Sequence, residues 1–374
     1  MKNVTFVKKA LALVMAAAMT LSLAACGSSG TSAASAASTT SAASAASAAE
    51  PTAETSAAAP EAAGATYKVG IVKYVDDASL DQIETAIQTE LDAKGAELGV
   101  TFDYADYTKN GQADSTTLNQ IAADLIADEV DVIIPIATPA ALIMQAATEE
   151  NQIPVVFSAV SDPVGAGLVN SLDAPGSNIT GTSDALNSKA VIDLMLAANP
   201  EMKKLGLLYD QGQDSSKLAI SEAIAYCQEK GIETVEKTGT TNDELSMAAE
   251  ALVAEGVDAV FTPTDNTVMT AELAIYEKFV EAKIPHYAGA DSFALNGAFC
   301  GYGVNYVTLG TATADMVVDI LVNGANPAET PVQIMSSGIA MVNTETAEAI
   351  GLDYSMFADM CEEVKETTTM ESFE

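Results

Sequence analysis

The sequence predicts an α/β protein whose body consists of two doubly wound lobes, each built on a parallel β-sheet, joined by a hinge. Short apolar runs alternate with longer amphipathic stretches, which is typical of the strands and helices of such sheets. The same order of runs also occurs twice along the chain. Ligands of open α/β sheets bind outside the carboxyl ends of the strands, so two facing lobes predict one shared cleft.

The first half of the body contains three apolar runs typical of buried strands, at 69–72, 130–136 and 153–157. Ser79 precedes an amphipathic stretch at 80–91, which predicts the first helix. After the second strand, Thr138 offers a capping hydroxyl and Pro139 a first-turn proline. These two residues predict a second helix that runs through Thr148.

The second half of the body repeats this order. The corresponding segments are 205–209 with 69–73, 252–260 with 125–133, and 283–285 with 152–154. Thr264-Asp265-Asn266 falls where Ala137-Thr138-Pro139 fell, directly after a predicted strand. Three matched blocks in the same order indicate a duplicated unit, with equivalent loops at the cleft.

The start of the chain has the pattern of a secretory signal. Lys2, Lys8 and Lys9 form a basic start, and an uncharged stretch of Leu, Ala, Val and Met follows. The sequence Leu-Ala-Ala-Cys at 23–26 resembles a bacterial lipobox. We therefore expect a lipoprotein signal peptide at 1–25, lipidation of Cys26, and anchoring to the outer face of the cell membrane, because two acyl chains hold a protein stably on a bilayer.

The rest of the chain divides by composition. From Gly27 to Thr66 it contains no aromatic or large aliphatic side chain, which predicts a disordered tether at 26–65. The body is long enough for two domains. The expected ranges are 66–185 plus 294–328 for lobe 1, and 186–293 plus 329–360 for lobe 2.

Composition also excludes several classes of function. The formal net charge is −36, and all 16 basic residues are lysines, so the basic patch of a nucleic-acid-binding protein is absent. His286 is the only histidine, and the three cysteines of the body have no metal-site spacing. We therefore expect no metal, no cofactor and no enzymatic activity.

Four further blocks carry a family resemblance. They are VVFSAVSDPVGAGLV at 155–169, PGSNITGTSD at 175–184, ATPAA at 137–141 and TDN at 264–266. Together they make the body, 67–354, similar to the substrate-binding proteins of tryptophan/tyrosine-type ABC transporters. The resemblance implies a type I periplasmic-binding fold, a monomer that meets ABC permease subunits, and an aromatic amino acid (tryptophan, tyrosine or phenylalanine) in the cleft. One departure is Asp76-Asp77-Ala78, where family members often carry His-Pro.

An amino acid ligand needs a partner for each of its charges. With no arginine to bind the carboxylate, a helix N-terminus is the best remaining anion site. The helix starts at Ser79 and at Thr138 to Ala140 are the candidates for this role. Asp291 and Asp265, each expected at the end of a strand, are candidates for the ammonium group, and the resemblance adds Asn266.

Other predicted ligand contacts lie at strand ends. Tyr74 and Tyr209 occupy matching places in the two repeats and could stack on an aromatic ring, and Ser161 could face the cleft. Two alternatives remain open at this point. The same fold could bind another small neutral or cationic solute, or it could act as a sensory receptor that is not coupled to transport.

Overall fold

The computed structural model describes residues 64–370. The expected signal peptide 1–25, Cys26 and most of the tether 26–65 lie outside the described residues. The described residues all belong to one compact unit. Within the described part, no helix has the length and apolar character needed to cross a membrane.

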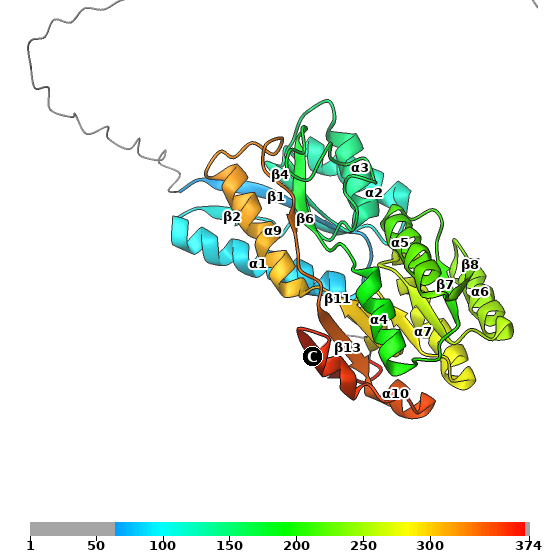
Figure 1. Ribbon diagram of the computed structural model, residues 1–374. Coiled ribbons are helices and arrows are strands. Elements are labelled where there is room, and N and C mark those ends of the chain that lie inside the picture. The colour runs from blue at the N-terminus through cyan, green and yellow to red at the C-terminus, as the bar shows by residue number, and fades with distance from the viewer. Residues whose placement is uncertain (1–63, 371–374) are drawn as a thin grey trace, which may run out of the picture. The chain divides into compact units, whose positions relative to one another are not determined.

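The first lobe is built on an all-parallel sheet with the order β12-β6-β5-β4-β1-β2, in which β3 also pairs with β1 (Figure 1). Its strands are β1 (Thr66–Lys73), β2 (Thr101–Asp103), β3 (Thr108–Asn110), β4 (Val132–Ile136), β5 (Val155–Phe157), β6 (Ile179–Ser183) and β12 (Gln333–Ile334). Its helices are α1 (Ala78–Leu98), α2 (Ser115–Ala127), α3 (Thr138–Thr148) and α9 (Tyr306–Leu321).

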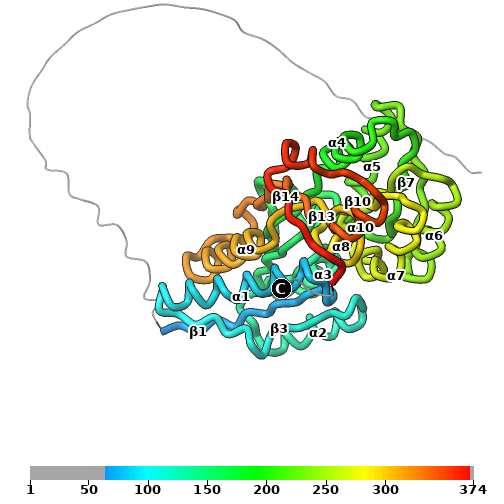
Figure 2. Tube along the Cα trace, turned by 90° about the horizontal axis from the view of Figure 1, so that it is seen from below, coloured from blue at the N-terminus to red at the C-terminus, as the bar shows by residue number. Residues whose placement is uncertain are grey.

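Alternate residues of the first sheet point to opposite faces and form two separate cores. Ile71 packs in the cluster under α1 and α9, whereas its neighbour Val72 packs in the cluster under α2 and α3. Figures 1 and 2 both show α1 and α9 side by side. The strands β4, β5 and β6 are buried along their whole length, as expected for a sheet covered on both faces.

The second lobe has the order β14-β13-β11-β10-β9-β7-β8, and only the β11–β13 pair is antiparallel. Its strands are β7 (Lys204–Tyr209), β8 (Glu233–Thr238), β9 (Ala259–Thr262), β10 (His286–Ala288), β11 (Cys300–Gly303), β13 (Ile339–Asn343) and β14 (Glu363–Thr367). Its helices are α4 (Ser188–Ala198), α5 (Asp214–Lys230), α6 (Asn242–Glu255), α7 (Asn266–Ala282), α8 (Asp291–Leu295), α10 (Thr344–Ile350) and the 3₁₀ helix η1 (Ser355–Asp359).

The two sheets repeat one strand order, β2-β1-β4-β5-β6 in the first and β8-β7-β9-β10-β11 in the second. The predicted fold class, two doubly wound parallel-sheet lobes, is therefore confirmed. The chain passes between the lobes three times, at 184–187, 304–305 and 335–338. These three short crossings form the hinge region.

The strands nearest the hinge differ from the expected lobe ranges. Strand β11 belongs to the second sheet, although the range 294–328 was assigned to lobe 1. Strand β12 pairs with β6 of the first sheet, although 329–360 was assigned to lobe 2. Both strands are short and lie beside a crossing, and the sequence pattern does not mark the residue at which the chain changes lobe.

Candidate ligand-binding site

A cavity lies where the carboxyl ends of strands from both sheets meet. About 340 Å³ lies between its walls when open solvent is included, but the centre of a water-sized sphere can occupy only about 20 Å³ of it, so the walls must move apart to admit a larger ligand. The residues that line it come from both lobes: Ser79, Leu80, Ala137, Thr138, Ala159, Ser161, Asp184, Ser215, Thr264, Asn266, Met269, Ala290 and Tyr306. The cavity therefore occupies the cleft that the duplicated α/β architecture predicts.

The helices that start at this cavity include both capped and uncapped ones. Of the ten α-helices within residues 64–370, seven have an N-cap side chain that accepts a backbone N–H of the first turn. The three without such a bond are α3, α5 and α8. All three have a residue at or near their start in the cavity lining, namely Thr138, Ser215 and Ala290. First-turn N–H groups at these ends are left for another acceptor.

At two of these helix starts, those of α3 and α5, a lining residue also has a hydroxyl without a partner. Thr138 Oγ1 and Ser215 Oγ are buried, and neither has a hydrogen bond to the described residues. Buried polar atoms are satisfied in most native structures, so such groups indicate a missing partner. The two hydroxyls come from opposite lobes, which places donors on both sides of the cavity.

The backbone at the cavity contains two unusual conformations. Ala137, the residue before α3, has φ 81°, and Ala159, which follows β5, has φ 55°. Non-glycine residues rarely adopt positive φ, and such strain is concentrated at functional sites. Because Ala137 is the N-cap, Thr138 is the first helical residue and not the cap that the sequence predicted.

A buried carboxylate lies in the cavity wall next to the hinge. Asp184, just after β6, is only 6% exposed, and its Oδ1 accepts a hydrogen bond from Ser161 Oγ at 3.0 Å. No lysine is among the residues that line the cavity. Burial raises the pKa of Asp184 to about 6, because the charged form loses its hydration. A cationic group in the cavity would stabilise the charged form of Asp184 and lower its pKa again.

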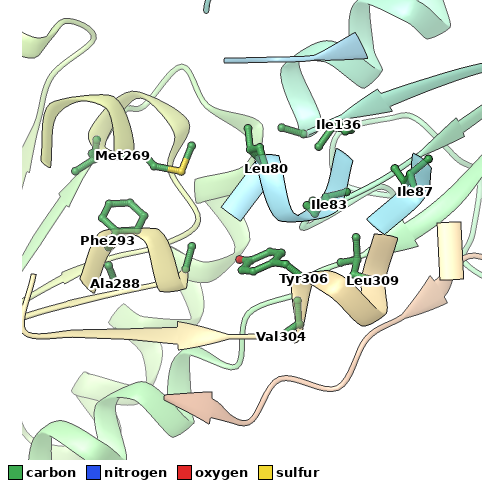
Figure 3. Packing of buried hydrophobic residues seen from close by; sticks show 14 of the residues in the cluster. Leu80, Ile83, Ile87, Ile136, Met269, Ala288, Phe293, Val304, Tyr306 and Leu309 are labelled. Atoms are coloured by element: carbon green, nitrogen blue, oxygen red, sulfur yellow. The ribbon is translucent and has the colours of Figure 1, made fainter. Parts of the chain in front are cut away.

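The lining also has an apolar part, which includes one aromatic ring. Leu80 and Met269 come from opposite lobes, and Figure 3 shows Met269 extending toward Leu80, with the Tyr306 ring near Leu80. Tyr306 is the first residue of α9, directly after a crossing between lobes, and it is 3% exposed. Burial raises its pKa well above the ordinary value, and the nearby charge of Asp184 acts in the same direction.

Four of the predicted ligand contacts line the cavity: Ser79, Thr138, Ser161 and Asn266. Ala140 is fully buried in the first turn of α3, behind the lining. The Tyr209 hydroxyl donates to Glu236 at 2.7 Å on the neighbouring strand, away from the cavity. Tyr74 is half-buried and likewise outside the lining.

The two predicted ammonium partners have other contacts. Asp265 caps α7 and accepts hydrogen bonds from the backbone N–H groups of Thr267, Val268 and Asp210 and from Ser216 Oγ. Asp291 accepts from Ser79 and Gln82 of the other lobe. Neither carboxylate lines the cavity in this structure. Asp77, at the position of the departure from the family pattern, caps α1 and is likewise outside the lining.

Four polar lining residues were not predicted from the sequence: Asp184, Ser215, Thr264 and Tyr306. Ser215 had a usable signal, because it precedes a helix at the place that matches Ser79 in the other repeat. Asp184 ends the resemblance block at 175–184 but was not chosen as a ligand contact. Tyr306 gave no signal, since its place in the cavity depends on the crossing between the lobes.

Comparisons with known proteins agree with this architecture. The family model for ABC transporter substrate binding proteins matches residues 68–357. A tyrosine-binding protein from Clostridioides difficile is 31% identical over 286 residues, which are 76% of this chain and 81% of that protein.

Two solved structures are similar over most of this chain. The ABC domain from Streptococcus pneumoniae in complex with L-Trp is 30% identical, with a TM-score of 0.74 over 80% of this chain and 99% of that one. The ligand-free, open structure of a substrate-binding protein with adhesive properties from Clostridium difficile is 31% identical, with a TM-score of 0.63 over 81% of this chain and 100% of that one. The chain therefore belongs to the family of ABC transporter substrate-binding proteins.

Proposed function

We propose that this protein binds an aromatic L-amino acid in the cleft between its lobes and delivers it to an ABC importer. The observation that carries the proposal is the meeting of two uncapped helix starts, two unpaired buried hydroxyls and one buried carboxylate in a single cavity. This set of groups is complementary to a zwitterion. The tyrosine-binding and L-Trp-bound relatives support an aromatic amino acid.

The carboxylate of the ligand has donors at α3 and α5. Thr138 Oγ1 and Ser215 Oγ are unpaired, and helix N-termini stabilise anions through their free N–H groups and dipoles. This arrangement replaces the guanidinium clamp, which a chain without arginine lacks. The ammonium group of the ligand then pairs with Asp184, whose carboxylate is buried in the same cavity.

The side chain of the ligand has an apolar wall to contact. Leu80, Met269 and Tyr306 line the cavity together with Ala290. An aromatic ring between these groups would gain contact area on both sides and an edge or stacked contact with Tyr306. Small-molecule sites generally combine apolar walls with a few convergent polar groups in this way.

The proposal also covers location and partners. We propose that the chain is a monomeric lipoprotein, held on the outer face of the membrane by acyl chains on Cys26, which meets ABC permease subunits and performs no chemical step. The lipobox-like sequence supports the anchor, and the family supports the transport role. A Cys26→Ala variant should appear in the culture medium or soluble fraction, whereas the wild-type protein should stay with membranes. Equal membrane retention of both would contradict lipid anchoring.

Calorimetric titration tests the ligand proposal directly. A fragment that begins at residue 58 and contains the compact unit should bind one or more of L-Trp, L-Tyr and L-Phe, with release of heat and a rise in melting temperature. The matched control is the same titration with acidic and aliphatic amino acids. Binding only to a neutral or cationic solute without a carboxylate would favour the alternative ligand class. No response to any amino acid would overturn the proposal. Neighbouring genes for a permease and an ATPase would separate transport from sensing.

A further inference from the structure

We propose that Asp291 is a positioning residue that holds the two lobes closed over the cleft and does not contact the ligand. The assignment concerns the same cleft as the proposed function and in that sense rests on it. It replaces the ammonium-binding role that the sequence predicts for Asp291 with a contact between protein groups. The partners of its carboxylate, their place in the fold and the closed arrangement of the lobes carry the inference.

Both oxygen atoms of Asp291 are bound by helix α1 of the other lobe. Ser79 Oγ donates to Oδ1 at 2.5 Å, and Gln82 Nε2 donates to Oδ2 at 3.0 Å. Ser79 Oγ also accepts from the backbone N–H of Ser292 at 3.2 Å. The start of α1 and the start of α8 are thus joined by hydrogen bonds in both directions. We call this set of contacts, made by Ser79, Gln82, Asp291 and Ser292, the α1–α8 latch.

The latch extends from Ser79 in the lining of the ligand cavity to Asp291 and Gln82 outside that lining. Asp291 and Gln82 line a second hollow together with Asn305 and Lys365, and neither of them lines the cavity. Tyr306 lines both spaces. The Asp291 carboxylate is not part of the cavity lining, and both of its oxygen atoms already accept hydrogen bonds from α1. Asp184 is the buried carboxylate that faces the cavity.

The arrangement of the lobes is consistent with a closed state. The chain is similar to the L-Trp complex with a TM-score of 0.74 but to the ligand-free, open structure with only 0.63, although the identities are nearly equal. Ser161 of the first lobe also donates to Thr264 of the second at 3.3 Å, across the cavity. Of these two contacts between the lobes, the latch includes a carboxylate, whereas the Ser161–Thr264 contact joins two hydroxyls. Hydrogen bonds to a charged group are stronger than those between neutral groups.

A second carboxylate, that of Asp77, lies beside the latch and opposes closure. Asp77 of the first lobe lies close enough to Asp291 for the two charges to raise the pKa of Asp77, in addition to the larger effect of its burial. The positive charge of Lys365, on β14 of the same lobe as Asp291, acts to lower the pKa of Asp291. Repulsion between the two carboxylates limits the stability of the closed state. The lobes can then reopen to release the ligand.

The latch has a distinct thermodynamic consequence. If only the closed state binds ligand tightly, the apparent dissociation constant equals the intrinsic constant divided by the closed fraction. Loss of the latch lowers this fraction by the same factor for every ligand. Loss of a true ammonium contact, by contrast, weakens only ligands that carry an ammonium group.

The experiment compares L-Trp with 3-indolepropionate, which lacks the amine, in the wild type, Asp291→Ala and Gln82→Leu. Both variants should lose affinity by about tenfold for both ligands, within the usual range of coupling between sites. Asp184→Asn is the matched control and should weaken L-Trp alone. Loss of L-Trp binding without loss of 3-indolepropionate binding in Asp291→Ala would overturn the latch, as would unchanged affinity for both.

Scattering without ligand gives an independent readout. The radius of gyration of ligand-free Asp291→Ala and Gln82→Leu should exceed that of the wild type, and urea unfolding should show that both variants fold. If Asp291→Ala does not fold, Gln82→Leu alone decides. An unchanged radius of gyration in folded variants would reject the latch. If no aromatic amino acid binds the wild type, the proposed function fails, but the scattering comparison still tests the latch.

Discussion

The two lobes use equivalent helix starts in opposite ways. In the first lobe, α1 is capped by Asp77 and α3 is left uncapped. In the second lobe the order is reversed: α5, the counterpart of α1, has no side-chain cap, and α7, the counterpart of α3, is capped by Asp265. Within this pair of equivalent helices, each lobe therefore presents one uncapped start to the cleft, at places that the internal repeat does not make equivalent.

This crossed pattern separates stability from binding within one duplicated fold. The capped starts are satisfied by protein groups, so they contribute to folding and are unavailable to a ligand. The uncapped starts keep unpaired hydroxyls, Thr138 Oγ1 and Ser215 Oγ, at the cavity. Removal of a group from a capped start should therefore affect the free energy of unfolding, and removal from an uncapped start should affect affinity.

The largest effect is expected for Asp265→Ala. This change removes the cap of α7 and leaves the buried N–H groups of Val268 and Asp210 and the Ser216 hydroxyl without an acceptor. The free energy of unfolding should fall by about 3 kcal/mol, which combines a lost cap with unsatisfied buried donors. Urea denaturation measures it. Asp114→Ala, at the exposed cap of α2, is the control and should lower the free energy of unfolding much less, because its partner N–H group remains accessible to water. A change in affinity without a change in stability would contradict the assignment of Asp265 to the fold.

Asp184→Asn should have the next largest effect, and on affinity. The variant keeps the size of the side chain but removes the charge that pairs with the ligand's ammonium group. Loss of one member of a buried charge pair costs about 2–5 kcal/mol, so the dissociation constant for L-Trp should rise by a hundredfold or more. Calorimetry measures this constant. Stability should not decrease, because burial raises the pKa of Asp184 to about 6 and so disfavours its charged form in the empty cleft. Unchanged affinity would remove Asp184 from the ligand site.

The fold could be predicted because its signals repeat. Strands such as β4 and β9 are continuous apolar runs, and their counterparts occur in the same order in both halves. The hinge was harder to predict, because β12 has only two residues and both are exposed. A strand this short carries no periodic signal, and only its pairing with β6 shows to which lobe it belongs.

The site was predicted less completely, because the sequence does not show which groups at a helix start are already hydrogen-bonded within the protein. Thr138 and Asp265 both precede or begin a helix after a buried strand, so the sequence ranks them alike. Only the structure shows that Asp265 is saturated and Thr138 Oγ1 is unpaired. Asp291 is a similar case, since its partners Ser79 and Gln82 are more than 200 residues away in the chain.

Thr138→Val should separate the two roles at an uncapped helix start. The replacement is nearly isosteric and removes a buried hydroxyl that has no partner in the unliganded protein. Stability should stay the same or rise slightly, whereas affinity for the amino acid should fall by about tenfold to a hundredfold, the range for a hydrogen bond to a charged group. Thermal melting and calorimetry on the same sample measure both. Ser215→Ala should behave alike on the opposite wall. A loss of stability in Thr138→Val would show that the hydroxyl serves the fold.

The smallest effect is the dependence of affinity on pH. Burial raises the pKa of Asp184 to about 6. The titratable or polar groups close to its carboxylate are the hydroxyls of Ser161 and Tyr306. Binding of an ammonium group requires the ionised carboxylate and lowers its pKa again. As the pH falls from 7 to 5, the ligand must displace a proton, so affinity for L-Trp should fall by about tenfold.

A comparison of two ligands separates the α1–α8 latch from the Asp184 site. The latch acts on the closed fraction, so any effect of pH on Asp77 or Asp291 changes the affinity for every ligand by the same factor. The ratio of L-Trp to 3-indolepropionate affinity cancels this shared contribution and reports Asp184 alone. The ratio should fall below pH 6 in the wild type and stay flat in Asp184→Asn. A constant ratio in the wild type from pH 7 to pH 5 would show that the ammonium group pairs with another residue.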